Sequence, residues 1–323
     1  MPLPLPLTAH ELESLAAAHG TPLQLYDEAG MRANCTAFLR AMRSRFPAFK
    51  QYFAVKALPC PAVLRLLVSE GCGLDCSSVS ELHAAALLGV PSEDIIFTSN
   101  YTSRADLAVA VDQGVTLNLD DASLVAALTA ARGGCPELIS FRLNPGLGRT
   151  DSETASNVLG GPAAKFGVPR EQIVGAYATA RAAGATRFGM HMMTGSCVLD
   201  ESLSYWRATT AALLDAVADV HAALGIEFQF INLGGGLGIP YKPGMPAADV
   251  EALAAALRET VNERIASHRL PFEPRLAMEN GRYMTGPFGW LVARCEAIKD
   301  AHERFYGLDA CMANLMRPGM YGR

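Results

Sequence analysis

Short runs of apolar and β-branched residues alternate along the chain with longer stretches in which apolar positions recur at helical spacing. The short runs predict eight strands: Tyr52–Lys56, Gly73–Ser77, Ile95–Thr98, Val115–Leu119, Leu138–Leu143, Arg187–Met192, Phe228–Leu233 and Arg275–Glu279. The longer stretches predict helices, several of which end at glycine: Ser80–Leu88, Ala105–Asp112, Ala122–Ala131, Arg170–Ala183, Leu203–Leu224 and Ala247–Ala266.

Strands that alternate with helices predict an α/β fold with a parallel sheet, and eight strands are the number that closes a (β/α)8 TIM-type barrel. The alternative is an open, doubly wound sheet. Such a sheet usually has a G-x-G-x-x-G turn after its first strand, whereas the first strand here runs into Lys56-Ala57-Leu58-Pro59. The sequence therefore favours the barrel.

Two segments lie outside the predicted barrel, which we place at residues 31–285. Residues 1–30 contain an isolated strand, Leu23–Tyr26, and residues 286–323 contain two β-like runs, Trp290–Ile298 and Arg304–Cys311, with no helix between them. These runs predict the start of an all-β domain that takes Leu23–Tyr26 as one of its strands. We expect the chain to end before such a domain is complete.

Composition excludes several classes of function. Half of the 323 residues are apolar and the net charge is −5 with both signs interspersed, so nothing indicates nucleic-acid binding. The proline-broken N-terminus lacks a basic region, and we expect neither a signal peptide nor a membrane span. Eight scattered cysteines form no CxxC pair. They predict reduced thiols in a cytoplasmic compartment and no metal site.

Lys56 stands at the end of the first predicted barrel strand, Tyr-Phe-Ala-Val-Lys. Functional groups of such barrels gather at the carboxyl ends of the strands. Burial of a lysine ammonium is costly, so a buried lysine tends to become a neutral amine that can form a Schiff base with an aldehyde cofactor. The structural alternative is a lysine whose ammonium reaches solvent, and the other strand ends bear on the choice.

Glycine-rich turns with polar neighbours follow the last three strands. These turns are Thr194-Gly195-Ser196, Gly234-Gly235-Gly236 and Glu279-Asn280-Gly281-Arg282. Glycine lets the backbone approach an anion and direct N–H groups at it, and Ser196 and Arg282 add donors. Each turn alone is compatible with a purely structural role. Together, on neighbouring strands, they predict a phosphate site.

Charged residues at the remaining strand ends suggest partners for such a ligand. A buried carboxylate at Glu279 needs a cationic or N–H partner, which is either a structural ion pair or a protonated pyridine nitrogen. Lys56 and the phosphate site favour the pyridine. Asp75, Glu81 and Arg142 predict either a network that positions Lys56 and the ring or ordinary interior ion pairs.

His191 and Met193 share parity on the sixth strand and therefore face the same side of it. If Met193 lies beside the cofactor, His191 lies roughly 6.6 Å back along the strand, at the usual strand rise. A core histidine is the alternative to a role in cofactor binding.

Taken together, eight motifs in order from about Thr21 to Tyr321 resemble the fold-type III pyridoxal-phosphate decarboxylases, and within them the diaminopimelate decarboxylases most. The motifs are Y-F-A-V-K, G-L-D-C-S-S-x-x-E, F-R-L-N-P, K-F-G-V, H-x-x-T-G-S, G-G-G-L-G-I-P-Y, E-N-G-R and D-A-C-M-A-N-L-M-R-P-G-M-Y. The resemblance implies an alanine racemase-like barrel, pyridoxal 5'-phosphate as the cofactor and a homodimer with shared active sites.

The resemblance also implies roles for residues. Lys56 carries the cofactor and Glu279 faces its ring nitrogen, and both are catalytic. Ser196, Gly234–Gly236, Asn280, Gly281 and Arg282 hold the phosphate, with Asp75, Arg142, His191 and Met193 completing the cofactor site. Arg282, Arg317 and Tyr321 bind the carboxylates of the substrate. The implied reaction is decarboxylation of meso-diaminopimelate to L-lysine, a step of lysine biosynthesis.

Three departures from the family pattern keep alternatives open. Met193 stands where the family usually has a histidine, Asn280 replaces a proline, and the chain ends soon after Tyr321, before the family's cysteine acid. We therefore expect a weak or inactive enzyme. Another basic amino acid (D-ornithine, D-lysine, ornithine or arginine) as substrate, or an inactive regulatory homologue, stays possible. Glu279 argues against a racemase, because alanine racemases place an arginine at the ring nitrogen.

Overall fold

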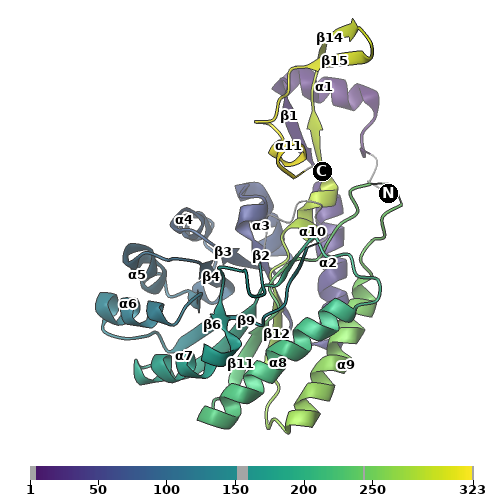
Figure 1. Ribbon diagram of the computed structural model, residues 1–323. Coiled ribbons are helices and arrows are strands. Elements are labelled where there is room, and N and C mark those ends of the chain that lie inside the picture. Colours follow the sequence, from purple (N-terminus) through teal and green to yellow (C-terminus); the bar gives the residue numbers. More distant parts are fainter. Residues whose placement is uncertain (1–4, 151–158, 243, 322–323) are drawn as a thin grey trace.

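The computed structural model describes residues 5–150, 159–242 and 244–321, and at its centre is a closed parallel barrel (Figure 1). Eight strands follow one another in the order β5-β4-β3-β2-β12-β11-β9-β6, and a β5–β6 pairing closes the ring. The predicted (β/α)8 barrel is confirmed. The strands are β2 (Lys50–Ala54), β3 (Gly73–Cys76), β4 (Ile95–Ser99), β5 (Thr116–Leu119), β6 (Leu138–Asn144), β9 (Arg187–Met192), β11 (Phe228–Asn232) and β12 (Arg275–Met278).

An outer ring of helices covers the barrel (Figure 1). The helices are α2 (Glu28–Arg45), α3 (Pro61–Ser69), α4 (Val79–Leu87), α5 (Arg104–Asp112), α6 (Ser123–Arg132), α7 (Arg170–Ala182), α8 (Ser204–Leu224) and α9 (Val250–His268). Asp27, Ser78, Ser103 and Asp249 begin four of them by accepting a hydrogen bond from a first-turn N–H. Each predicted helix agrees with an observed one to within a few residues.

The barrel interior is filled by side chains rather than by solvent. Tyr52, Ile96, Phe230 and Ala277 form a small cluster there, separate from the main core between strands and helices. Gly189 makes room for this layer, because a Cβ atom at that position would overlap the ring of Phe230. The interior is therefore a packed core, and function belongs to the ends of the barrel.

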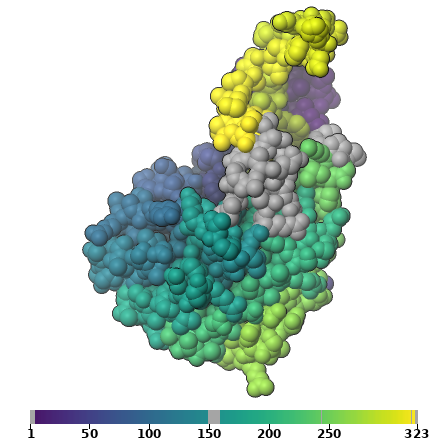
Figure 2. Space-filling model, viewed as in Figure 1, coloured from purple at the N-terminus to yellow at the C-terminus, as the bar shows by residue number. Residues whose placement is uncertain are grey.

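The two ends of the described chain meet above the barrel. β1 (Leu23–Tyr26) pairs antiparallel with β13 (Gly289–Val292), and β14 (Cys295–Asp300) forms a hairpin with β15 (Arg304–Leu308). The predicted run Trp290–Ile298 is thus divided between two strands. The hairpin projects away from the barrel, at the upper end of the molecule in Figure 2.

Short elements complete the fold. They are α1 (Ala9–His19), α10 (Arg282–Thr285), α11 (Met316–Tyr321), β7 (Arg149–Thr150), β8 (Val168–Pro169), β10 (Gly195–Ser196), η1 (Val55–Ala57), η2 (Ser92–Asp94) and η3 (Gly286–Phe288). Within the described ranges, no helix has the length and apolar character needed to cross a membrane.

Candidate active site

A cavity of about 610 Å³ opens at the carboxyl ends of the barrel strands. It brings together twelve predicted site residues: Lys56, Asp75, Arg142, His191, Met193, Ser196, Gly235, Gly236, Glu279, Gly281, Arg282 and Arg317. Gly234 and Asn280 are buried beside it. Tyr321 is the last residue of α11. Its side chain lies outside the described part of the structure.

Lys56 enters the cavity from a turn and not from the strand itself. β2 ends at Ala54, and Lys56 lies in the single turn η1. Its side chain is 61% exposed, with Nζ 3.4 Å from Asp75 Oδ2 and 3.2 Å from Ser77 Oγ. The negative charge of Asp75 raises the pKa of the Lys56 ammonium, and burial opposes this only in part. The expectation of a buried lysine at a strand end is therefore wrong and the alternative holds, because the chain leaves the strand two residues early and solvent reaches the ammonium.

Asp75 lies on β3 and is almost completely buried. Burial, with the nearby charge of Glu279, raises the pKa of Asp75 to about 7 against the opposing effect of Lys56. Its Oδ2 contacts Lys56, and its Oδ1 has no hydrogen-bond partner among the described residues. A buried acceptor of this kind is costly unless a ligand or water completes it.

Glu279 follows β12 and accepts hydrogen bonds at both carboxylate oxygens. Oε1 is 2.7 Å from Asn232 Nδ2, and Oε2 is 3.1 Å from Nε2 of the buried His191. Burial by itself raises the pKa of Glu279, but His191, Lys56 and Asn232 together bring that pKa below its usual value. Glu279 is therefore an ionised carboxylate. Each of its oxygens has a second lone pair for a further donor.

The turn after β11 requires glycine at successive positions. Gly236 has φ of 106°, and a Cβ on it would overlap the carbonyl oxygen of Gly195. A Cβ on Gly235 would lie 2.6 Å from the carbonyl oxygen of Glu279. Gly234 N donates to Asn232 Oδ1 at 2.9 Å, so this N–H is already used within the protein. The backbone of this turn packs directly against the turns that follow β9 and β12.

Asn280 connects two of these turns. Its Oδ1 accepts from Leu237 N at 3.2 Å, and its Nδ2 donates to Gln51 Oε1 at 3.3 Å. The residue that departs from the family pattern thus holds the end of the glycine turn against the end of β12. Its contribution is to the shape of the cavity wall.

Arg142 and Met193 form another part of the wall. Nη2 of the buried Arg142 donates to the carbonyl oxygens of Leu159 and Met193, each at 3.1 Å, and its guanidinium lies 4.4 Å from the ring centre of Phe166. Burial lowers the pKa of Arg142. Met193 Sδ accepts from Gly235 N at 3.2 Å. The aromatic contact and the two carbonyls position Arg142, which makes no direct ion pair with Asp75 among the described residues.

Glu81 makes no direct hydrogen bond or ion pair with Lys56 among the described residues, but its negative charge helps to raise the pKa of both Lys56 and Asp75. Its Oε2 accepts from Ser77 N at 2.5 Å, at the beginning of α4. It therefore orders the turn that presents Ser77 to Lys56.

Two arginines flank Tyr241 at the cavity. The guanidinium carbon of Arg317 lies 4.9 Å from the ring centre of Tyr241, and that of Arg282 lies 5.9 Å from it. Nη1 of Arg282 is buried without a hydrogen-bond partner among the described residues. Sequence reasoning assigned no role to Tyr241, although it ends the motif G-G-G-L-G-I-P-Y. Its place at the end of this motif was the one feature of the sequence that could have indicated a role for Tyr241.

Tyr26 and Thr98 also line the cavity without having been predicted. Thr98 lies on β4, whose end carries no charged residue that would attract notice. Tyr26 comes from β1, outside the barrel, and reaches the cavity because β1 pairs with β13. No local pattern in the sequence indicates that contact.

These residues suit the pyridoxal phosphate that the sequence resemblance predicts. Three buried polar atoms have no hydrogen-bond partner among the described residues: Asp75 Oδ1, His191 Nδ1 and Arg282 Nη1. The glycine turn exposes backbone that a Cβ atom at these positions would obstruct. The amine of Lys56 faces the same cavity. In the part of the chain that the structure describes, no group of three or more His, Cys, Asp or Glu could hold a metal ion.

Comparison with known proteins gives consistent matches. A family model described as pyridoxal-dependent decarboxylase, pyridoxal binding domain, matches residues 32–286. Protein TabA of Pseudomonas amygdali pv. tabaci is 39% identical over 96% of this chain and 70% of its own length. A diaminopimelate decarboxylase of Methanothermobacter thermautotrophicus is 35% identical over 95% of this chain and 71% of its own.

Solved structures agree with the sequence matches. The crystal structure of diaminopimelate decarboxylase from M. jannaschii in complex with L-lysine superposes with a TM-score of 0.85 at 28% identity. The match covers 96% of this chain and 72% of that one. Barrel and flanking strands therefore both follow a known arrangement.

Proposed function

The chain belongs to the pyridoxal-dependent decarboxylases, and we propose that it converts meso-diaminopimelate to L-lysine and carbon dioxide. The observation that carries the reaction is the meeting of Lys56, Asp75 and Glu279 in one cavity beside a glycine turn. The substrate is supported by relatives named diaminopimelate decarboxylase and by the L-lysine bound to the M. jannaschii enzyme.

Pyridoxal 5'-phosphate is the cofactor of this family, and when bound it supplies an electron sink for the electron pair that a departing carboxylate leaves. Lys56 would provide the amine to which the aldehyde of the cofactor is attached. That amine must first lose a proton, and Asp75 Oδ2 is 3.4 Å away. Because the pKa of Asp75 is raised to about 7, it is a better proton acceptor than an ordinary aspartate.

Glu279 would face the ring nitrogen of the cofactor and favour the protonated form of that nitrogen. Its pKa is below the usual value because His191, Lys56 and Asn232 outweigh the effect of burial, so it stays ionised and favours a positive partner. His191 and Asn232 fix the orientation of the carboxylate. Ser196, Gly235, Gly236, Gly281 and Arg282 would hold the phosphate, and Asn280 keeps two of these turns together.

Arg282 and Arg317 bind substrate carboxylates, and both guanidinium groups lie within 6 Å of the ring centre of Tyr241, at 5.9 and 4.9 Å. Diaminopimelate carries a second carboxylate far from the reacting carbon, which lysine, ornithine and arginine lack. A pair of cations at the cavity therefore suits the diacid better than a basic amino acid with a single carboxylate.

The test is carbon dioxide release in the presence of pyridoxal phosphate. We expect release from meso-diaminopimelate to exceed release from D- and L-lysine, D- and L-ornithine and L-arginine. Lys56→Ala should abolish turnover and the borohydride-trappable adduct. Faster release from one of the basic amino acids would refute the substrate, and an adduct at Lys56 without any release would favour the regulatory alternative.

We also propose a homodimer and a β-domain separate from the barrel. The β14–β15 hairpin exposes Ile298, Phe305, Tyr306 and Leu308, which is apolar surface of the kind that a partner covers. Light scattering behind size-exclusion chromatography measures the mass directly. A monomer at micromolar concentration would contradict the dimer.

A further inference from the structure

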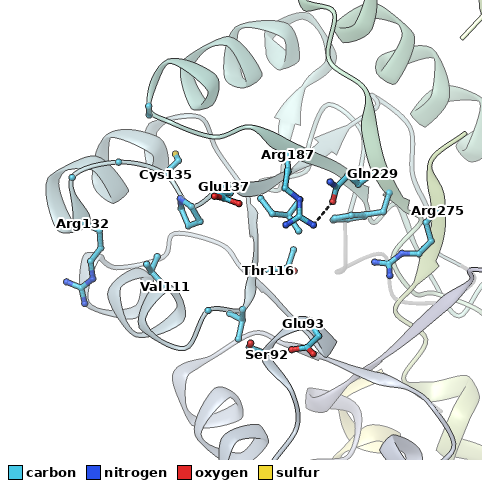
Figure 3. Close-up of a pocket in the computed structure, with 18 residues that line it drawn as sticks. Ser92, Glu93, Val111, Thr116, Arg132, Cys135, Glu137, Arg187, Gln229 and Arg275 are labelled. Atoms are coloured by element: carbon cyan, nitrogen blue, oxygen red, sulfur yellow. Dashed lines mark hydrogen bonds between the residues drawn. The ribbon is translucent and has the colours of Figure 1, made fainter. Parts of the chain in front are cut away.

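A second cavity, of about 920 Å³, lies at the opposite end of the barrel, where the strands begin (Figure 3). Thr116, Arg187 and Arg275 line it from the first residues of β5, β9 and β12. In barrels of this kind that end normally serves stability, and chemistry occurs at the other end. The decarboxylase reaction therefore gives no reason for a large charged cavity here.

Two guanidinium groups in this cavity have no carboxylate partner among the described residues. Arg187 Nη2 donates to Gln229 Oε1 at 3.0 Å. Arg275 Nη2 donates to the hydroxyl of Tyr52 at 3.4 Å. On the rim, by contrast, Arg132 is paired with Asp112 at 2.5 Å. Arg187 and Arg275 thus keep most of their donors for another acceptor.

Two carboxylates line the same cavity and are likewise unpaired within the described ranges. Glu93 and Glu137 are both exposed, and neither side chain forms an ion pair there. The carbonyl oxygen of Glu137 accepts from the N–H groups of Thr186 and Arg187, which holds it next to the start of β9. Figure 3 shows Arg187, Gln229 and Arg275 along one side of the cavity, with Glu93 across from them.

We propose that this cavity binds a free α-amino acid in its zwitterionic form. Arg187 and Arg275 would hold the carboxylate, because guanidinium donors match carboxylate oxygens in pairs. Glu93 and Glu137 would hold the ammonium. The volume lies within the range of small-molecule sites, ~300–1,000 Å³.

The mixed charge decides the class of ligand. A phosphate or a simple dicarboxylate would be attracted by the arginines but repelled by the two glutamates, whereas an amino acid uses both. The site is separate from the active site and does not depend on the substrate proposed above. Its ligand would reach the barrel from the end where no reaction occurs.

Cys135 provides a site-specific test, since its half-buried thiol lines this cavity. Burial raises the pKa of Cys135, so alkylation by iodoacetamide is followed at pH ~8.5, near the ordinary thiol pKa. We expect saturating L-lysine to slow alkylation of Cys135 about fivefold, because a bound ligand restricts access to the thiol. The exposed Cys295 and Cys311 serve as internal controls and should react at unchanged rates. Cadaverine, which lacks the carboxylate, and acetate, which lacks the ammonium, should not protect.

Variants then locate the binding. Arg187→Gln or Arg275→Gln should raise the half-protecting concentration of L-lysine about tenfold, and Glu137→Gln should raise it similarly. Arg207→Gln is the matched control, because Arg207 pairs with Glu259 on the surface outside this cavity. The same protection in Lys56→Ala would separate this site from the active site. No protection by L-lysine, equal protection by acetate, or protection that survives the arginine variants would overturn the proposal.

Discussion

Replacing Asp75 with asparagine removes the carboxylate that lies 3.4 Å from Lys56 Nζ. Two unit charges at this separation attract by about 1 kcal/mol in bulk water and by about 5 kcal/mol at an effective dielectric constant of about 20. Because the Lys56 side chain is 61% exposed, solvent screening places the value near the lower limit, about 1–2 kcal/mol. That corresponds to about one pKa unit.

The sign follows from the chemistry of attachment. Only the neutral amine attacks the aldehyde, and ionised Asp75 raises the pKa of Lys56, so Asp75 keeps the lysine in its unreactive ammonium form up to a higher pH. We expect Asp75→Asn to move the midpoint of adduct formation about one pH unit lower. The assay is borohydride trapping of pyridoxal phosphate on Lys56 across the pH range, with the modified peptide identified by mass spectrometry.

Asp120→Asn is the matched control for this experiment. Asp120 follows β5, is mostly buried and accepts a hydrogen bond from Gly167 N, but it is not among the groups that shift the pKa of Lys56. It should leave the midpoint where it is. An unchanged midpoint in Asp75→Asn, with the cofactor still on Lys56, would refute the reasoning.

Four further outcomes are expected. Glu279→Gln should keep cofactor binding, measured by absorbance, while turnover falls about 10²–10⁴-fold; unaltered turnover would contradict its role. Asp75, with a pKa raised to about 7 in the folded protein, favours folding at low pH and loses that contribution as pH rises toward about 7. Melting temperatures should therefore fall less between pH ~4 and ~7 in Asp75→Asn than in the unaltered protein. Tyr241→Leu should raise KM about three- to tenfold through lost cation–π contacts, whereas Tyr241→Phe should keep it near the original value. Gly189→Ala should destabilise by about 1–3 kcal/mol in urea unfolding because its Cβ meets Phe230, whereas Gly175→Ala, at an exposed position of α7, should not destabilise.

Local pattern was sufficient for the barrel. The eight strand runs and six helical stretches are separated by turn residues, and each run is short enough to be only one element. Hydrophobic periodicity depends on local packing, so it identifies each helix and strand. Because parallel strands need crossover helices between them, few topologies are then possible for these elements. The positions of Lys56, Asp75 and Glu279 at strand ends followed from the same reasoning, and the structure brings all three to one cavity.

The chemical state of these residues was decided by tertiary structure. The exposure and charge of Lys56 depend on where β2 ends and on how closely Asp75 lies to it. Neither can be predicted from the local sequence. The ionised state of Glu279 depends on His191, a residue 88 positions away. Sequence reasoning could place His191 on the correct face of its strand but could not assign its partner.

The contacts of Tyr26 and Tyr241 show the same division. Tyr26 precedes the barrel and reaches the cavity only because β1 and β13 pair across most of the chain length. Tyr241 lies between two arginines that come from separate helices, α10 and α11. The order of apolar and polar residues determines which elements form. Distances between residues far apart in the chain determine charge states and partners, because electrostatic interactions depend on separation and burial in the folded molecule.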